Sequence, residues 1–392
     1  MSLQGGFGGF GGFGGFGGFG GFGGFGGFGG FGGFSGGGGF GAQGGADNQA
    51  LIQHRDGIVG SWVTASNYPP QLPQETTNPT VNLPRWEPWV RATLIDFDLF
   101  SRLHFAAESP GFTLWDMDVK VSVLPAPAPA TAVATPQRIA RMSRPGGTSN
   151  NKPFWNKQLD ILASWADLRA ERSGEILAQL TPPLHFWSSI ENLRPDRHLA
   201  TLEVLWAALR LANHVEMRFK HALACRRPVE MSAQVQPMIG TPGHGSLPSG
   251  HATEAFIVAY VLWSLVHKAD TTNHRTWFEQ LMRQAARVAI NRTIAGVHFP
   301  VDSAAGQVLG LALGEYFVHR ATGSPTYSSW DFAGAAYPKD LDFNWRELYQ
   351  PGTALRNNVA LSGYASQILA TQTSVISNPL QALWNQAKAE WP

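Results

Sequence analysis

The chain has 392 residues, of which 43% are hydrophobic and only 15% are charged, and its formal net charge is +1. A charge balance this close to neutral excludes the extended basic field of proteins that bind nucleic acid or anionic membranes. Its single cysteine, Cys225, excludes an intramolecular disulfide.

The N-terminal segment is of low complexity, with Gly-Gly-Phe repeated in strict period from residue 5 to residue 34. Collagen shares this period, but it needs one glycine per triplet and abundant proline, whereas two of every three residues here are glycine. One phenylalanine per triplet cannot offset the backbone entropy of glycine, so we expect residues 1–46 to form a disordered tail. The phenylalanines either mediate self-association or partner binding, or have no role.

Residues 47–152 form a second region, rich in aromatic residues and interrupted by proline. Periodicity predicts a helix within residues 89–107, and alternation predicts a strand within residues 114–124. The proline- and alanine-rich residues 125–136 are typical of an extended linker, and residues 143–153 of a loop. We therefore expect an irregular, mixed region that packs on the core formed by the rest of the chain.

Residues 153–392 show helical periodicity and no strong strand signal. Pro228 is expected to end the second predicted helix, and the chain after residue 322 is expected to be irregular apart from its last helix. The longest apolar run, residues 255–266, is too short to span a bilayer, and the N-terminus lacks a signal-peptide pattern. The sequence predicts a mainly α, cytoplasmic protein built on a helical bundle. Its helices are expected at residues 154–180, 197–226, 251–266, 275–295, 302–319 and 378–390.

Three sequence blocks carry residues suited to chemistry. In the first, Lys220 and Arg227 are seven residues apart, which on a helix places both on nearly the same face. They are either a pair of cations that binds an anion or a solvated face favoured by the dipole at the C-terminal end of the helix.

The second block, Pro-Ser-Gly-His at residues 248–251, leads into an apolar predicted helix. A helix start offers unpaired N–H groups to an anion, and Gly250 allows the backbone to approach a ligand closely. Ser249 is either a further donor or a plain N-cap, and His251 can exchange a proton near neutral pH. His244, seven residues earlier, is either a further functional histidine or a surface-loop residue.

The third block holds Arg292, His298 and Asp302 around a predicted turn between two helices. Asp302 fits the N-cap of the second helix, and it can also accept a hydrogen bond from His298 and fix its tautomer. The other ring nitrogen of His298 is then available as a ligand or a nucleophile. Together the blocks supply cations, a helix N-terminus, a hydroxyl group and histidines, which predicts a site for a tetrahedral or trigonal-bipyramidal oxyanion.

These blocks resemble the signature of the superfamily that joins type 2 phosphatidic acid phosphatases, bacterial acid phosphatases and vanadium-dependent haloperoxidases. The family pattern is Lys, six residues, Arg-Pro; then Pro-Ser-Gly-His; then Ser-Arg, five residues, His, three residues, Asp. All the spacings match over about residues 220–310, and Asn291 stands where the family usually has serine.

The resemblance implies a helical bundle with an oxyanion pocket at one end. It makes His251 the acid–base residue and His298 either the phosphate-attacking nucleophile or the axial ligand of vanadate. It also implies a set of residues that hold the oxyanion: Lys220, Arg227, Ser249, Gly250 and Arg292.

Two reactions fit this resemblance, because vanadate mimics phosphate. We expect a vanadium-dependent haloperoxidase, which oxidises halide with hydrogen peroxide, because the chain has no membrane span or signal peptide and similar bromoperoxidases carry a histidine where this chain has His244. The alternative is a soluble phosphomonoesterase of the acid-phosphatase type that works through a phosphohistidine. A third reading is a non-catalytic scaffold whose Gly-Phe tail makes it a homo-oligomer.

Overall fold

The computed structural model describes residues 79–117, 136–146, 151–180, 184–349, 360–361, 363–372 and 374–392. The predicted Gly-Phe tail lies outside these residues, as does nearly all of the predicted linker. The described residues divide into two units, with residues 79–91 in the first and the described residues from 92 to 392 in the second. In the first unit the described elements are α3 (Pro79–Asn82), the 3₁₀ turn η4 (Leu83–Arg85) and the start of α4 (Pro88–Phe100).

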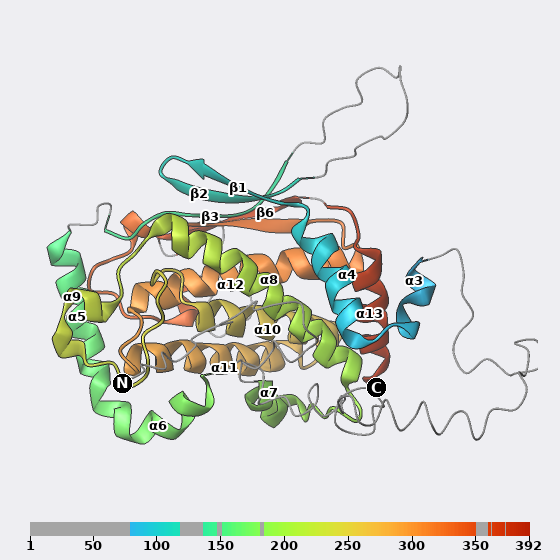
Figure 1. The fold of residues 1–392 in the computed structure, drawn as a ribbon, viewed down its shortest axis with the longest axis horizontal. Helices are drawn as coiled ribbons and strands as arrows, with labels where there is room; N and C mark the ends of the chain where they lie inside the picture. The colour runs from blue at the N-terminus through green and yellow to red at the C-terminus, as the bar shows by residue number, and fades with distance from the viewer. Residues whose placement is uncertain are drawn as a thin grey trace, which may run out of the picture. The chain divides into compact units, whose positions relative to one another are not determined.

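Four long helices form the core of the second unit: α8 (Leu199–Leu223), α10 (Gly250–Val266), α11 (His274–Ile294) and α12 (Pro300–Thr322). Helix α10 packs against the other three, and Figure 1 shows them side by side. The residues of α10 and α12 are buried on almost every side, which explains why these two helices lack a polar face. A Cβ atom at Gly306 or Gly310 of α12 would lie 2.6 Å from atoms of α10, so glycine permits this close packing.

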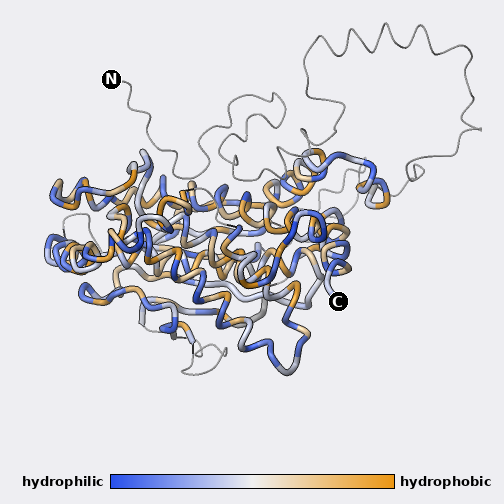
Figure 2. Tube along the Cα trace, turned by 90° about the horizontal axis from the view of Figure 1, so that it is seen from below, coloured by the Kyte–Doolittle hydropathy of each residue, from blue (hydrophilic) through white to orange (hydrophobic). Residues whose placement is uncertain are grey.

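Shorter helices surround this core. Most helices in Figure 2 carry both hydrophobic and hydrophilic residues, as expected where one face packs and the other meets solvent. None of the described helices is long and apolar enough to cross a membrane. The shorter helices are α5 (Lys152–Trp165), η5 (Ala166–Leu168), α6 (Arg169–Ala178), α7 (Leu184–Glu191), α9 (Pro228–Met231), η6 (Ala233–Val235), η7 (Gly334–Ala336), η8 (Trp345–Leu348) and α13 (Asn378–Ala389).

A six-stranded sheet, in the order β1-β2-β3-β4-β6-β5, lies over α12. Strands β3 and β4 pair in parallel, and the other pairs are antiparallel. The sheet joins strands from both sides of residue 153. Its strands are β1 (Leu103–Glu108), β2 (Gly111–Asp116), β3 (Gln137–Met142), β4 (Tyr327–Phe332), β5 (Ala360–Leu361) and β6 (Ala365–Gln372).

The prediction of a mainly helical protein is confirmed, but the sheet corrects its details. The helix predicted over residues 89–107 stops at Phe100, and the chain turns into β1 because those residues pair with β2. The segment after residue 322 is not irregular, since it supplies β4 and β6. Five of the six residues of β4 are buried, so the strand lacks the alternation that would have predicted it.

The helices of the core lie close to their predicted positions, with two corrections. The predicted helix at residues 154–180 is two helices, α5 and α6, separated by η5. Helix α8 ends at Leu223, where Ala224 takes a left-handed conformation (φ 47°), and Pro228 begins α9 instead of ending α8. Arg227 therefore does not share a helix face with Lys220, contrary to the prediction.

Candidate active site

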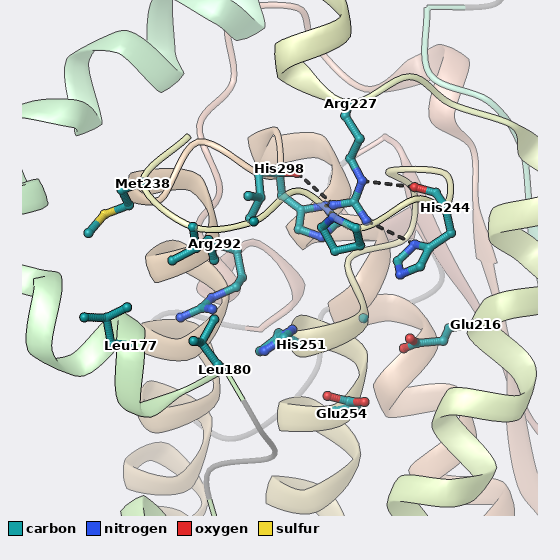
Figure 3. A pocket seen from close by; sticks show the side chains of 15 residues that line it. Leu177, Leu180, Glu216, Arg227, Met238, His244, His251, Glu254, Arg292 and His298 are labelled. Carbon is teal, nitrogen blue, oxygen red and sulfur yellow. Dashed lines mark hydrogen bonds between the residues drawn. The ribbon is translucent and has the colours of Figure 1, made fainter. Parts of the chain in front are cut away.

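A cavity of about 240 Å³ lies where the end of α8, the start of α10, the end of α11 and the turn before α12 meet (Figure 3). One side of its wall is apolar and includes Leu177, Leu180 and Met238. Six of the nine predicted site residues line it: Arg227, His244, Gly250, His251, Arg292 and His298.

The other three predicted residues lie behind the wall and hold its segments together. The ammonium group of Lys220 donates a hydrogen bond to the carbonyl oxygen of Pro248, which ties α8 to the loop before α10. Burial lowers the pKa of Lys220 to about 8, although nearby carboxyl groups act in the opposite direction. The hydroxyl oxygen of Ser249 accepts a hydrogen bond from the backbone N–H of Ala252 at 3.4 Å, so Ser249 is the N-cap of α10.

Asp302 is buried next to His298, and its Oδ2 lies 3.1 Å from Nδ1 of the ring. The same oxygen accepts hydrogen bonds from the hydroxyl of Ser246 and from the backbone N–H of Phe299. Phe299, and not Asp302, is the N-cap of α12, and Asp302, at the third helical position, accepts from the backbone N–H of this N-cap. Asp302 thus satisfies a helix-terminal N–H and orients His298 at the same time.

His298 is held as a neutral ring. Burial lowers its pKa well below the usual value, and the positive charges of Arg227 and Lys220 lower it further. Burial also raises the pKa of Asp302 to about 6, which leaves this carboxyl ionised above that pH. Because the Asp302 carboxylate can only accept, Nδ1 of His298 carries the proton and Nε2 has a lone pair.

Arg227 contacts both His244 and His298 in the wall of the cavity. Its Nε donates to the carbonyl oxygen of His244 at 3.1 Å, and its Nη1 donates to that of Val297 at 2.8 Å. Its Nη1 lies 2.9 Å from Nε2 of His298, and its Nη2 lies 3.1 Å from Nδ1 of His244 (Figure 3). His244 therefore positions Arg227 at the wall of the cavity.

Arg292 is buried, and its hydrogen bonding is incomplete. Its Nη2 donates to Oε1 of Gln179 at 3.0 Å and to the carbonyl oxygen of Ile176 at 3.2 Å. Its Nε and Nη1 are buried and have no hydrogen-bond partner within the described part of the chain. Buried guanidinium groups are normally satisfied, so the open N–H donors of these two nitrogens, in a residue that lines the cavity, fit the oxygens of a phosphate or vanadate ion.

His251, at the start of α10, is oriented by Gln179. Its Nε2 lies 2.8 Å from the carbonyl oxygen of Gln179, which can only accept, so Nε2 carries a proton. Burial lowers the pKa of His251 to about 3, and the charge of Arg292 adds to this effect. The ring is neutral near pH 7, and Nδ1 is then an acceptor.

Several residues of the site were not predicted. Glu216 and Glu254 line the cavity, four residues before Lys220 and three residues after His251, so helical spacing could have indicated them. Gln179 reaches the site from the residue after α6 and carries no sequence signal.

Asn291, the departure from the family pattern, supports the site indirectly. Its side-chain amide donates to Oε1 of Gln179 at 3.0 Å and to Oε1 of Glu175 at 2.9 Å. Since Gln179 in turn contacts Arg292 and His251, Asn291 stabilises the part of the wall that orients both residues.

Of the comparisons with known proteins, the family model agrees with the sequence blocks. No curated protein matches the chain. One matching solved structure is the first transmembrane PAP2 type phosphatidylglycerolphosphate phosphatase from Bacillus subtilis; it is 19% identical, covers 40% of this chain and 72% of its own, and has a TM-score of 0.25. The sequence model of the PAP2 superfamily matches residues 201–323, which include all nine predicted site residues. Residues 201–323 are therefore similar to the PAP2 superfamily.

Proposed function

We propose that the chain is a phosphatase of the PAP2 type, which hydrolyses phosphate monoesters through a phosphohistidine at His298. The observation that carries this proposal is the neutral ring of His298, oriented by Asp302, in the same cavity as the open N–H donors of Arg292. The match of residues 201–323 to the sequence model of the PAP2 superfamily supports it.

In the proposed reaction, Arg292 and Arg227 bind the phosphate oxygens and neutralise their charge. Lys220, behind the wall, adds positive charge, and the first turn of α10 at Gly250 offers its helix N-terminus. These groups stabilise the negative charge on the phosphoryl oxygens in the transition state.

The chemical steps use the two histidines. Nε2 of His298 attacks phosphorus, the ester P–O bond breaks, and the leaving oxygen takes a proton from His251 once Nδ1 of that ring has itself been protonated. A water molecule then attacks phosphorus and gives a proton to His251, and the P–N bond to His298 breaks to release phosphate. The substrate is a small molecule with an accessible phosphate group.

The prediction of a vanadium-dependent haloperoxidase rests on the family resemblance and stays a prediction. Vanadate has the same tetrahedral oxygens as phosphate, so Arg292 and Arg227 would hold it, with His298 as a ligand. Bound vanadate would supply the activation of hydrogen peroxide for halide oxidation. The third reading, a scaffold, depends on a Gly-Phe tail that lies outside the described residues.

One experiment separates these functions. The purified full chain is assayed for hydrolysis of p-nitrophenyl phosphate and, in parallel, for bromination of a phenol dye with vanadate, peroxide and bromide. We expect hydrolysis that vanadate inhibits, and a phosphohistidine that acid quenching destroys and alkaline quenching preserves. His298→Gln should abolish both, whereas His104→Gln, at an exposed histidine of β1, should not.

Contrary results have clear meanings. Full hydrolysis by His298→Gln contradicts the site assignment. Bromination without hydrolysis favours the haloperoxidase, and the absence of both activities favours the scaffold.

A further inference from the structure

Two acidic side chains lie in the floor of the same cavity. Glu216 of α8 and Glu254 of α10 are 1% and 3% exposed, and both line the cavity with His251 and Arg292. Figure 3 shows the carboxyl group of Glu254 below His251 and that of Glu216 to the right of His251. The proposed function gives neither residue a role.

Each carboxyl group has an oxygen that lacks a partner. Oε2 of Glu216 and Oε1 of Glu254 are buried and accept no hydrogen bond from any described residue. An ionised carboxylate is costly to bury without a partner, and two carboxylates that share a site do not both ionise. The open oxygens therefore indicate that the pair retains a proton.

Burial and the charges around Glu216 and Glu254 agree with a pair of carboxyl groups that retains a proton. Burial raises the pKa of both groups, that of Glu254 to about 7, and the charge of Glu254 raises that of Glu216 further. The positive charge of Lys220 on α8 acts in the opposite direction on both. Arg227, from the loop after α8, lowers the pKa of Glu216, and Arg292 on α11 lowers that of Glu254.

The packing holds the pair close to His251. A Cβ atom at position 250 would lie 2.5 Å from Oε1 of Glu216, so this carboxyl group rests directly against the first turn of α10. Glu254 is three residues after His251 and four after Gly250, which places all three on the same side of α10.

His251 needs a source of protons for the proposed reaction. Its one proton is on Nε2 and is donated to the carbonyl oxygen of Gln179. Nδ1 of the neutral ring is an acceptor and cannot protonate a leaving group until it receives a proton itself. Glu216 and Glu254 are the only carboxyl groups among the described residues that line the cavity.

We propose that Glu216 and Glu254 share one proton and act as the proton store of the site, charging Nδ1 of His251 during turnover. The proton passes from the pair to His251 and then to the leaving oxygen as the P–O bond breaks. When water attacks the phosphohistidine, its proton returns through His251 to the pair. The two glutamates are positioning residues that act through His251, and this inference rests on the proposed phosphatase function.

The test uses two substrates that differ in their need for a proton. The leaving group of an alkyl phosphate is a basic alkoxide that must be protonated. The leaving group of 2,4-dinitrophenyl phosphate is a dinitrophenolate, which is stable as an anion. Glu254→Gln should lower kcat/KM for the alkyl phosphate by about 100-fold, the usual scale of general acid catalysis, and leave kcat/KM for the dinitrophenyl ester unchanged. This ratio reports on cleavage of the ester bond alone, because hydrolysis of the phosphohistidine is common to both substrates.

Glu216→Gln provides a second readout. In this variant Glu254 is the one carboxyl group left, and the positive charges of Lys220 and Arg292 lower its pKa. Glu254 should therefore lose its proton at lower pH, and the basic limb of the pH–rate profile should move to lower pH. Glu203→Gln, at another buried glutamate of α8, is the matched control and should leave both the profile and the substrate ratio unchanged.

The outcomes are distinct. Equal losses on both substrates, or a basic limb that Glu216→Gln leaves in place, would overturn the proton store. If the wild-type chain hydrolyses neither substrate, the proposed function itself fails. Infrared spectroscopy tests the shared proton without turnover: the protonated-carboxyl band of the resting protein at neutral pH should disappear in the Glu216→Gln/Glu254→Gln double variant, and its persistence there would contradict the inference.

Discussion

Nη1 of Arg227 lies 2.9 Å from Nε2 of His298, so a cation donates a hydrogen bond to the nitrogen that the proposed reaction uses as its nucleophile. In this arrangement the lone pair of Nε2 is engaged. A phosphate group that binds the guanidinium of Arg227 would draw this N–H group away, because a charged oxygen is a stronger acceptor than a neutral ring nitrogen. Substrate binding would thus free the nucleophile next to the phosphorus atom.

The contact between His298 and Asp302 leads to the first prediction. Asp302→Asn should lower kcat for phosphate ester hydrolysis by about 10–100-fold, because an uncharged amide fixes the ring and supports its basicity less well. Steady-state kinetics with p-nitrophenyl phosphate check this. Asp302 also accepts from the N–H of Phe299, so a melting curve must accompany the assay.

Ser246→Ala is the control for this variant. It removes one donor to the carboxylate but leaves the contacts of Asp302 with His298 and Phe299 in place. We expect a smaller loss than for Asp302→Asn. The reverse order would show that the hydroxyl group of Ser246, and not the charge of Asp302, governs the ring.

The open donors of Arg292 lead to the second prediction. Arg292→Met should weaken competitive inhibition by inorganic phosphate by about 2 kcal/mol, or about 30-fold, because it removes charge-assisted hydrogen bonds to the anion. Isothermal titration or the inhibition constant measures this loss. Arg283→Met, at a side chain of the same helix that is 61% exposed, should leave phosphate binding unchanged. Unchanged binding in Arg292→Met would place the anion elsewhere.

The predictable part of the site depends on short-range spacing. His298 and Asp302 are four residues apart at a helix start, and their contact follows from that local geometry. The N-cap role of Ser249 was likewise one of two predicted alternatives. The joint helix face of Lys220 and Arg227 was predicted wrongly, because a left-handed residue after Leu223 ends the helix before Arg227.

The unpredicted part depends on long-range contacts. Gln179 orients both His251 and Arg292 across more than seventy residues of chain, and only the packing of α6 against α11 brings it there. The sheet has the same cause: β3 and β4 pair in parallel although nearly two hundred residues separate them. Such pairings leave no periodic signal in either segment alone.

The neutral state of His251 leads to the third prediction, which concerns stability. The pKa of His251 is lowered to about 3 in the folded state, whereas an unfolded histidine titrates near 6.5. Between these values the unfolded chain binds a proton that the folded chain does not, so this residue destabilises the fold progressively as the pH falls from about 6.5 to about 3. His251 changes the unfolding free energy by at most about 1.4 kcal/mol per pH unit.

Chemical denaturation of the wild type and of His251→Gln across this range measures the effect. The difference between their unfolding free energies isolates His251 from the carboxyl groups, whose raised pKa values act with the opposite sign. We expect the variant to lose less stability than the wild type as the pH falls. If the unfolding free energies of the wild type and the variant fall in parallel with pH, a neutral, buried His251 is contradicted.

The packing of Gly250 against Glu216 leads to the fourth prediction. In Gly250→Ala, the new Cβ atom would lie 2.5 Å from Oε1 of Glu216, so the carboxyl group or the start of α10 must shift. Overpacking of this kind costs about 1–3 kcal/mol of unfolding free energy, and the shift should also lower activity because His251 is the next residue.

Gly174→Ala is the matched control, since a Cβ atom at this position of α6 meets no atom within 4 Å. Because alanine stabilises a helix interior relative to glycine, the control should gain about 0.5–1 kcal/mol and keep full activity. If both variants gain stability, Glu216 does not rest on the first turn of α10 in solution, and the proton store loses its geometric support.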